Sequence, residues 1–290
     1  MERWIAVDWG STHLRGWLFA DDQCVQQLQL PLGITQLHGQ SPADIFGQYI
    51  APWREDAPVP VVMAGMIGSD AGWRRTPYLA CPTSLSDLSE RLCEVADNVW
   101  IVPGLMVQRA DGCDVMRGEE TQLAGVIQLM PAQCYVMPGT HCKWVDVDDG
   151  QICHFSTAMT GELHHLLMDH SLTGKGLPAQ QADNDAFKLG LERGMDTPSL
   201  ISRLFTARAD RLLGTLAVTS VADYLSGLLI GAEVSAFCRQ KKSGAVTLVG
   251  SPQLNARYRQ AFERINIAVT ECPGDNAFLQ GIRSLVYARQ

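Results

Sequence analysis

The stretch Ile5-Ala-Val-Asp8-Trp-Gly-Ser-Thr12 gives the first indication of the fold of this chain. An apolar run ends in an aspartate and passes directly into small residues, which predicts a buried strand followed by a tight turn. The amides and hydroxyls of Gly10, Ser11 and Thr12 could bind phosphate oxygens. Asp8 at the strand end could hold Mg²⁺, directly or through water. Taken alone, however, the pattern is more typical of a plain β-turn.

A second turn of this type follows another apolar run later in the chain. Cys134-Tyr-Val-Met137 predicts a strand, and Pro138-Gly139-Thr140-His141 is the turn after it. Each turn is followed by two more predicted strands, Leu14 to Ala20 and Val25 to Leu32 in one case and Lys143 to Val147 and Ile152 to Thr157 in the other. This matched pair of turns is much more specific for phosphate binding than either turn alone. A third small-residue turn, Gly250-Ser251-Pro252, could pack against an adenine.

Helices and strands alternate in the rest of each half. The first half predicts a helix beginning at Ser41-Pro42, helical spacing over Leu85–Val95 and Leu123–Met130, and strands at Val59–Met63 and Val99–Val102. The second half predicts helices over much of 160–240, strands at Val246–Val249 and Ile265–Val269, and a helix from about Asp275. We therefore expect an α/β protein with two similar domains, residues 1–132 and 133–290.

Composition excludes several classes of protein. The chain has 290 residues, 46% apolar and 19% charged, which is enough for a large core and too little charge for disorder. Its formal charge of −8 argues against nucleic-acid binding through a basic face. The best candidate for a membrane span, Ala222 to Cys238, contains Asp223 and Glu233, and the N-terminus lacks the basic region of a signal peptide. We expect a cytoplasmic protein with small-molecule partners, neither nucleic acid nor membrane among them, and leave a homodimer open.

The nine cysteines give no disulfide framework, because their number is odd and no Cys-x-x-Cys pattern occurs. A zinc site built from Cys142, Cys153 and nearby histidines matches no common ligand spacing. Reduced, half-buried thiols are the favoured interpretation.

Five longer segments resemble a known family over nearly the whole chain. They are Ile5-Ala-Val-Asp-Trp-Gly-Ser-Thr-His-Leu-Arg15, Ala64-Gly-Met-Ile-Gly-Ser69 with Gly72-Trp73, Asp114-Val-Met-Arg-Gly-Glu-Glu-Thr-Gln122, Pro138-Gly-Thr-His-Cys-Lys-Trp144 and Thr160-Gly-Glu-Leu163. The chain resembles the acetate kinase, sugar kinase, heat-shock protein and actin superfamily, and within it the 2-keto-3-deoxygalactonate kinases. The resemblance implies two ribonuclease-H-like domains with mixed sheets flanked by helices, and an active site in the cleft between them. It also implies ATP-dependent, Mg²⁺-assisted phosphorylation of the 6-hydroxyl of 2-dehydro-3-deoxy-D-galactonate.

Other functions stay open at this point. The chain could be a kinase for another sugar or sugar acid, or a phosphohydrolase related to exopolyphosphatases. A nucleotide switch like actin is disfavoured, because no long substrate-binding domain or polymer contact segment is apparent. Sugar-acid-dependent ADP release would distinguish a kinase from a hydrolase.

Phosphoryl transfer to a hydroxyl needs a base, and a carboxylate is expected in that role. Asp114, Glu119 and Glu120 lie just before or at the start of a predicted helix. The segment from Gly118 to Leu123 is similar to one in exopolyphosphatases in which a glutamate activates the nucleophile, so Glu119 is ranked above Asp114. Glu119 and Glu120 could equally complement the helix dipole.

An anionic sugar acid calls for a fixed cation, and arginine can bind both carboxylate oxygens at once. Candidates are Arg15, Arg74, Arg75 and Arg117, with Ser69 and Trp73 as further substrate contacts. Solvated arginines on a mobile loop are an equally good interpretation of Arg74 and Arg75.

The second turn offers further nucleotide contacts. Lys143 could reach the β- or γ-phosphate, and His141 is expected to order the turn. Thr160 and Gly161 could cap the next helix, bringing its first amides to a phosphate. On that helix, His164, His165 and His170 are poorly spaced for a shared ligand site, and satisfied surface or interface histidines are favoured.

Overall fold

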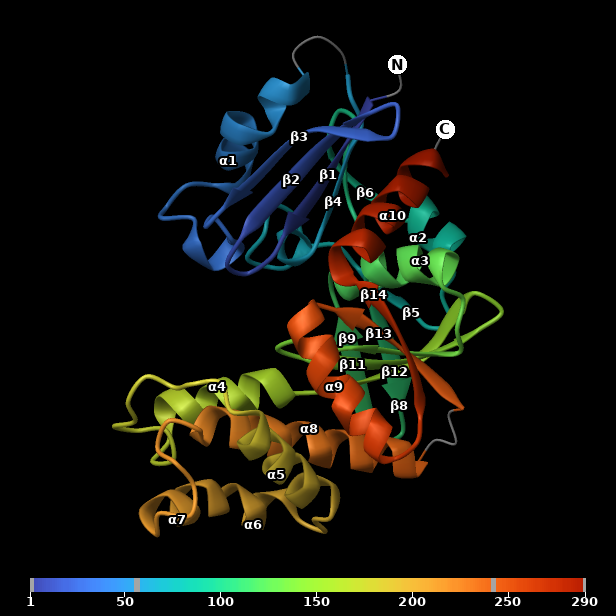
Figure 1. Cartoon of the computed structure of the whole chain (residues 1–290). Helices are drawn as coiled ribbons and strands as arrows, with labels where there is room; N and C mark the ends of the chain where they lie inside the picture. Colours follow the sequence, from blue (N-terminus) through green and yellow to red (C-terminus); the bar gives the residue numbers. More distant parts are fainter. Residues whose placement is uncertain (1–2, 55–57, 241–243, 289–290) are drawn as a thin grey trace. The chain divides into compact units, whose positions relative to one another are not determined.

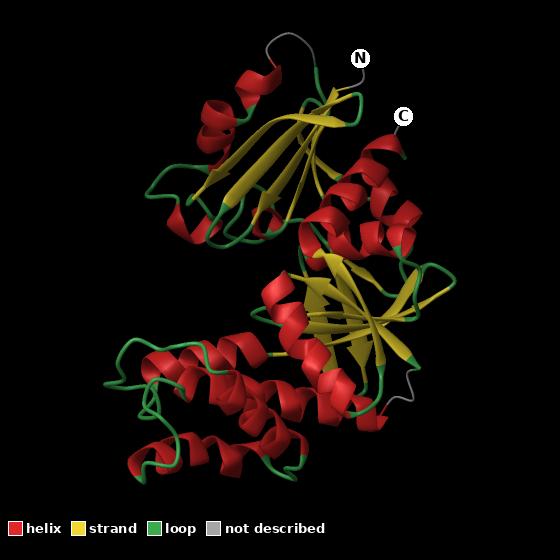
Figure 2. Cartoon of the chain, in the orientation of Figure 1, coloured by secondary structure: helices red, strands yellow, loops and turns green. Residues whose placement is uncertain are grey.

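Strand β1 (Arg3–Trp9) lies inside a six-stranded sheet of order β3-β2-β1-β4-β7-β6 in the computed structural model, which describes residues 3–54, 58–240 and 244–288 (Figures 1 and 2). β1 runs antiparallel to β2 and parallel to β4, so the sheet is mixed, as predicted. The other strands of this sheet are β2 (Leu14–Ala20), β3 (Gln23–Leu30), β4 (Val61–Ala64), β6 (Cys93–Ala96) and β7 (Val99–Ile101).

The two faces of β1 carry different side chains because successive residues of a strand point to opposite sides. Ile5, Val7 and Trp9 belong to the hydrophobic core beneath α1 (Pro42–Tyr49). On the other face, Trp17 of β2 contacts Phe278 of the C-terminal helix α10 (Gly274–Tyr287), with 5.7 Å between their ring centroids. Asp8 points to this second face, toward α10.

A second sheet repeats the strand order of the first. Its order is β12-β11-β10-β13-β14, which corresponds to β3-β2-β1-β4-β7, and β10 is parallel to β13 as β1 is to β4. The strands are β10 (Cys134–Met137), β11 (Cys142–Asp148), β12 (Gln151–Ala158), β13 (Ala245–Gly250) and β14 (Ala268–Pro273). The predicted duplication of architecture is therefore confirmed.

The chain divides into two compact units. Unit 1 comprises Met1–Gln133, Val145–Phe155 and Gly274–Gln290, and unit 2 comprises Cys134–Trp144 and Ser156–Pro273. In unit 1, α3 (Glu119–Leu129) and α10 (Gly274–Tyr287) lie side by side (Figure 1). Unit 1 also contains the short α2 (Leu85–Glu90). The helices of unit 2 are α4 (Thr160–His170), α5 (Asn184–Met195), α6 (Leu200–Leu204), α7 (Thr206–Leu212), α8 (Val221–Gln240) and α9 (Pro252–Arg264).

Two local predictions were wrong, and one sheet was missed. The helical spacing over Leu85–Val95 ends early, because α2 stops at Glu90 and Val95 lies in β6, antiparallel to β7. Ile265 closes α9, so the strand predicted there starts only at Ala268. A three-stranded sheet of order β5-β8-β9 was not predicted; it consists of β5 (Tyr78–Ala80), β8 (Gly104–Arg109) and β9 (Gly112–Met116).

Helices α5 and α8 approach each other closely along four glycines. A Cβ at Gly190 or Gly194 would lie 2.0 or 2.2 Å from a backbone oxygen of α8, and a Cβ at Gly227 or Gly231 would lie 2.0 or 2.4 Å from one of α5. Val221–Arg239 is long and apolar enough to cross a membrane, but 67% of its most apolar window is buried inside the unit, as in a core helix.

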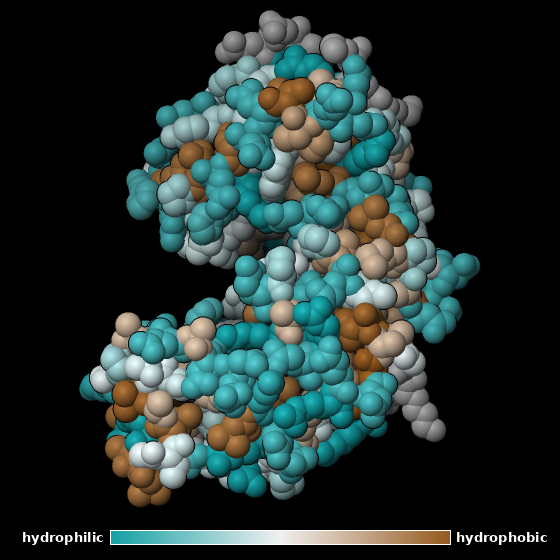
Figure 3. All heavy atoms as spheres, viewed as in Figure 1, coloured by the Kyte–Doolittle hydropathy of each residue, from teal (hydrophilic) through white to brown (hydrophobic). Residues whose placement is uncertain are grey.

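The surface of α6 and α7 is rich in exposed apolar side chains (Figure 3). Ile201, Phe205, Leu212 and Leu213 are between 64% and 85% exposed. In the described part of unit 2 these four side chains lie outside the core that holds Tyr224, Leu225 and Leu228.

Candidate active site

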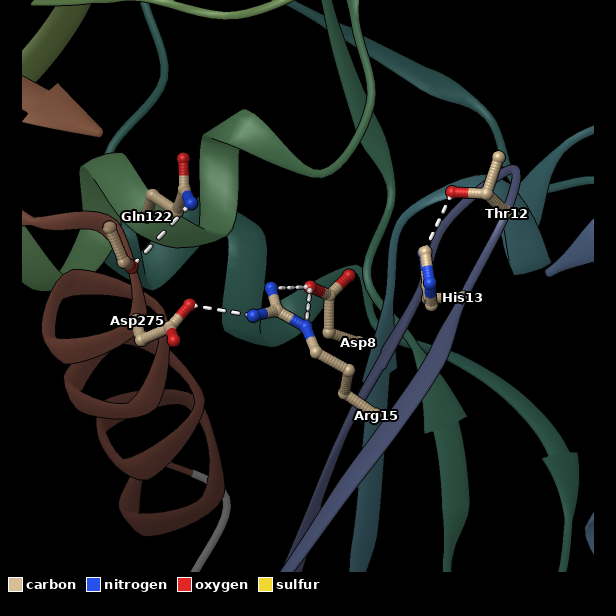
Figure 4. Close-up of polar contacts among 7 residues, drawn as sticks. Asp8, Thr12, His13, Arg15, Gln122 and Asp275 are labelled. Atoms are coloured by element: carbon tan, nitrogen blue, oxygen red, sulfur yellow. Dashed lines mark hydrogen bonds and ion pairs between the residues drawn. The ribbon is translucent and has the colours of Figure 1, made fainter. Parts of the chain in front are cut away.

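Asp8 is positioned where two parallel strands end. It pairs in register with Ala64, the last residue of β4. Its Oδ2 accepts hydrogen bonds from Nε (3.2 Å) and Nη2 of Arg15, while Arg15 Nη1 donates to Oδ1 of Asp275 at 2.8 Å (Figure 4). Gln122 of α3 donates at 3.5 Å to the Gly274 carbonyl at the start of α10. Arg15, predicted to bind substrate, is thus held between two carboxylates.

One oxygen of Asp8 is available for a ligand. Burial raises the pKa of this carboxyl, and the adjacent Arg15 guanidinium only partly opposes the rise. Arg15 occupies Oδ2, whereas Oδ1 accepts no hydrogen bond from the described residues. Mg²⁺ in kinases is bound by one or two carboxylates together with waters and substrate phosphates, so Asp8 fits that role.

The turn after β1 is anchored from outside. Ile34 N donates to Gly10 O, and both the amide and the hydroxyl of Thr35 donate to Ser11 O, at 3.0 and 2.7 Å. Thr12 Oγ1 lies 2.9 Å from His13 Nδ1 (Figure 4). Ser11 and Thr12 are exposed on a backbone that is held in place, while the Thr12 amide packs against Gly33, where a Cβ would lie 2.2 Å from Thr12 N.

The carboxylates at the start of α3 differ sharply in their surroundings. Glu120 is fully buried; its Oε2 accepts from Gly118 N at 2.6 Å and its Oε1 from Thr121 Oγ1 at 3.2 Å. Burial, and next the negative charge of Glu119, raise the pKa of Glu120 to about 7. Glu119 is partly exposed and accepts from Arg117 N at 3.2 Å. Of the two, only Glu119 has a carboxylate that a substrate could contact.

Glu119 belongs to the same edge of unit 1 as Asp8. A side chain at Gly118 would begin 3.4 Å from Cα of Gly65, the residue that follows β4. Asp114, by contrast, lies within β9, paired in register with Val107. Packing on Gly65 therefore brings the start of α3 to the strand ends that carry Asp8.

The predicted substrate contacts differ in how far their side chains are already used in contacts within the protein. Arg117 donates to the Thr76 hydroxyl and, at 3.0 Å, to the Thr76 carbonyl, and it stacks 4.4 Å from the ring centre of Tyr78. Ser69 Oγ donates to Met66 O at 2.7 Å, and Trp73 packs on the core beneath α1. Among the described residues, exposed Arg74 makes one hydrogen bond, from Nη1 to Glu94 O at 2.7 Å, and exposed Arg75 pairs through Nε with Asp70 at 3.3 Å.

Unit 2 contains a cavity of about 530 Å³ beside the second predicted phosphate turn. Gly139 and Thr140 of the turn line it together with Thr160 and Gly161 of α4. Glu162 N donates to Thr140 O at 2.9 Å, and His141 Nε2 donates to Glu162 Oε2 at 2.6 Å, so turn and helix are joined. Apolar walls come from Leu229, Ile230 and Leu254.

Charged and aromatic side chains line the same cavity. Arg257 of α9 pairs with Asp223 of α8 and lies 5.1 Å from the ring centre of Phe187. Burial lowers the pKa of His164, whose Nε2 donates to Ala222 O at 2.9 Å, so the ring is neutral at physiological pH. Both His164 and His165 line the cavity, a position that was not predicted; His165 is exposed and His164 is hydrogen-bonded, in agreement with satisfied surface or interface histidines.

Four other predicted nucleotide contacts, Lys143, Gly250, Ser251 and Thr160, have partners within unit 2. Lys143 is buried, and its Nζ donates to Thr157 Oγ1 of β12 at 2.9 Å, away from the residues that line the cavity. Gly250 ends β13, and Ser251 caps α9, accepting from Leu254 N at 3.3 Å. Thr160 does not cap α4 as predicted: it is the first helical residue, and its hydroxyl donates to Glu233.

The sequence profile of a family described as 2-keto-3-deoxy-galactonokinase matches residues 8–285. The chain belongs to this kinase family. The 2-dehydro-3-deoxygalactonokinase of Escherichia coli (strain K12) is 52% identical over 287 residues, covering 99% of this chain and 98% of that protein. A crystal structure from Sinorhizobium meliloti, described as a 2-dehydro-3-deoxygalactonokinase protein, has a TM-score of 0.90, 32% identity and 99% coverage of both chains. The predicted class, a carbohydrate kinase, is confirmed.

The fold of this chain extends beyond the family. The activator of the 2-hydroxyisocaproyl-CoA dehydratase from Clostridium difficile, with bound ADPNP, has a TM-score of 0.53 at 14% identity and covers 99% of this chain and 96% of its own. The predicted fold class is confirmed.

Several residues of the candidate site were not predicted from the sequence. Arg257, Tyr258 and Leu254 share one face of α9, a spacing that the Gly250-Ser251-Pro252 turn could have drawn attention to. Asp275 gave a weaker signal, since it was noted only as a helix start. Glu233 was noted only as an interruption of an apolar run, although a lone carboxylate in such a run indicates a buried polar contact.

We expect the stability of this kinase to depend on pH through Glu120. Its pKa is raised from 4.5 to about 7, so the folded state binds more protons than the unfolded state between these values. The free energy of unfolding should therefore fall as pH rises through this window, by up to about 3 kcal/mol. Glu120→Gln lacks this fall and should be more stable than wild type at pH 8 but not at pH 4.5. Urea unfolding at both pH values measures it, and a pH-independent difference would contradict it.

Gly161→Ala should weaken nucleotide binding by this kinase. Its Cβ would lie 2.4 Å from Gly139 O and 2.7 Å from Thr140 Cα, so the turn must shift. Overpacking of this kind typically costs about 1–3 kcal/mol, equivalent to about a 5- to 150-fold rise in Kd. Calorimetry with an ATP analogue measures the rise. Gly47→Ala in α1, where a Cβ meets nothing within 4 Å, is the control; equal affinity of the two variants would refute the expectation.

Proposed function

We propose that this kinase transfers the γ-phosphoryl group of ATP to the 6-hydroxyl of 2-dehydro-3-deoxy-D-galactonate in galactonate catabolism. The observation that carries the proposal is the full-length match to the Escherichia coli 2-dehydro-3-deoxygalactonokinase at 52% identity. A cytoplasmic location and self-association stay predictions.

The nucleotide is proposed to bind in the cavity of unit 2. Its adenosine would lie against Leu254 and the Gly250-Ser251 turn, with the Arg257 guanidinium available to stack on the base. Its phosphates would meet the Gly139–Thr140 turn and the first amides of α4, where the helix dipole favours anions. The ADPNP bound to the activator from Clostridium difficile, which has this fold, supports a nucleotide. Lys143 remains a proposed phosphate contact that would have to leave Thr157.

The acceptor is proposed to bind in unit 1, in the part of it that was predicted as the domain 1–132. Asp8 would hold Mg²⁺ through Oδ1, and the Ser11–Thr12 turn would bind the transferred phosphoryl group. Among the proposed arginines, Arg74 and Arg75 have most donors to spare for the sugar-acid carboxylate, because each uses a single N–H, toward Glu94 O and Asp70 respectively. Arg15 and Arg117 would then shape the site through their present partners.

The proposed chemistry uses few side chains. As the 6-oxygen forms its bond to the γ-phosphorus, the bond from that phosphorus to the β,γ-bridging oxygen breaks and ADP leaves. The Glu119 carboxylate accepts the hydroxyl proton and returns it to solvent. Mg²⁺, when bound, neutralises charge on the phosphate oxygens. Arg15 keeps Asp8 in one orientation throughout.

A coupled ADP-release assay against a panel of aldonic and 2-keto-3-deoxy acids tests the proposal. We expect turnover with the galactonate-derived acid and much less with its gluconate-derived C4 epimer. Phosphate release without acceptor would instead favour a phosphohydrolase. Turnover only with another sugar would correct the substrate and keep the class.

A further inference from the structure

Glu233 of α8 is a buried carboxylate that does not line the proposed nucleotide cavity. It is 6% exposed and borders a neighbouring cavity of about 390 Å³. Thr160 lines both cavities, so Glu233 stands behind the wall that faces the nucleotide.

Four donors converge on this carboxylate. Trp144 Nε1 donates to Oε1 at 2.6 Å, and Oε2 accepts from the Tyr258 hydroxyl at 2.7 Å and from the Thr160 hydroxyl. The Cys142 thiol is a further hydrogen-bond partner. No cation pairs with Glu233 among the described residues. A buried carboxylate held only by neutral donors depends on all of them, because each loss leaves a buried polar atom unsatisfied.

The donors come from three elements of unit 2: β11, α4 and α9. Cys142 and Trp144 lie on β11, directly after the Gly139–Thr140 turn. Thr160 starts α4, whose amides are packed on that turn, and Tyr258 of α9 lines the cavity wall. One carboxylate therefore fixes the turn, the helix terminus and the opposite wall relative to one another.

We infer that Glu233 is a positioning residue for nucleotide binding: it holds Thr160, Tyr258 and the strand after the phosphate turn in register without touching the nucleotide. This inference rests on the proposed function, because it takes the cavity of unit 2 as the nucleotide site. It separates the two substrates, since Glu233 and all its partners belong to unit 2.

Glu233→Gln tests the inference with little change in volume. A carboxamide has one acceptor oxygen where the carboxylate has two, so the four donors can no longer all be satisfied. We expect the Kd for the Mg²⁺ complex of a non-hydrolysable ATP analogue, measured by calorimetry on the full chain, to rise about tenfold or more. The KM for ATP should rise in parallel, while the KM for the sugar acid stays within about twofold. Glu263→Gln, at an exposed position of α9, is the matched control.

Trp144→Phe provides a second test, because the indole donates to Glu233 but does not line the cavity. Trp144→Phe should also raise the Kd for the ATP analogue, and the double variant should bind it no more weakly than Glu233→Gln alone.

If Glu233→Gln fails to fold, Trp144→Phe decides, and a folded Trp144→Phe with wild-type affinity overturns the inference. A folded Glu233→Gln that matches Glu263→Gln, or one that raises both KM values equally, also overturns it. Failure of the wild-type chain to bind the analogue would refute the proposed function instead.

Discussion

Asp8→Asn should lower kcat on the order of a thousandfold, the largest loss expected from any single substitution in this kinase. Asparagine keeps the shape of the side chain but removes the charge that a divalent cation requires of its ligand. It also leaves the Arg15 guanidinium with Asp275 as its remaining carboxylate partner. The KM for the sugar acid should change little, because the proposed acceptor contacts lie elsewhere.

The metal dependence of kcat checks this assignment. The variant should need far more Mg²⁺ for half-maximal rate, and calorimetry should show a weaker effect of Mg²⁺ on binding of the ATP analogue. Asp149→Asn is a suitable control, since Asp149 lies in an exposed turn with a positive φ of 45° that asparagine tolerates. Wild-type activity of Asp8→Asn at every Mg²⁺ concentration would eliminate Asp8 as the metal ligand.

Glu119→Gln should lower kcat by at least about a hundredfold with little change in nucleotide affinity. The glutamine keeps a hydrogen-bond acceptor toward Arg117 N but cannot take a proton from the 6-hydroxyl. General-base catalysis typically contributes about 10²–10⁴-fold, and the loose transition state of phosphoryl transfer places the loss near the lower limit. Steady-state kinetics with saturating ATP measures it, with Glu90→Gln at the exposed end of α2 as control.

Asp114→Asn distinguishes the two candidate bases. If Asp114→Asn is inactive while Glu119→Gln keeps near-normal kcat, the role moves to Asp114, which lies within β9. Activity in both variants would show that neither residue is the base.

Elements with strong local signals could be predicted from the sequence, and elements defined by distant partners could not. The helix after Ser41 was predicted because its N-cap serine and the proline at its first position are neighbouring residues; the structure adds a Ser41–Asp44 capping box. Leu88, Leu92 and Val95 have helical spacing, yet Val95 lies in the edge strand β6, because its neighbours Cys93, Glu94 and Ala96 pair with β7. The three residues of β5 are too few to show a period at all.

The same distinction separates the site residues. Arg15 and Arg117 stand beside motif segments and were therefore assigned to substrate. Their guanidiniums instead contact Asp275 and Thr76, which are 260 and 41 residues away. Thr160 has the sequence context of a helix cap, but its hydroxyl donates to a carboxylate 73 residues later. A linear pattern shows which chemistry is available in a segment; only packing decides which partner uses it.

The glycines between α5 and α8 bear on the order in which unit 2 folds. Each glycine costs a helix about 1 kcal/mol relative to alanine, and each of the two helices carries at least two of them at this contact. An isolated helix as short as α5 is marginal in water even without that penalty. The close backbone approach that compensates for it exists only once both helices are present. We therefore expect α5 to gain no lasting helicity before α8 docks, so that a refolding chain acquires protection from hydrogen exchange in both segments at the same time.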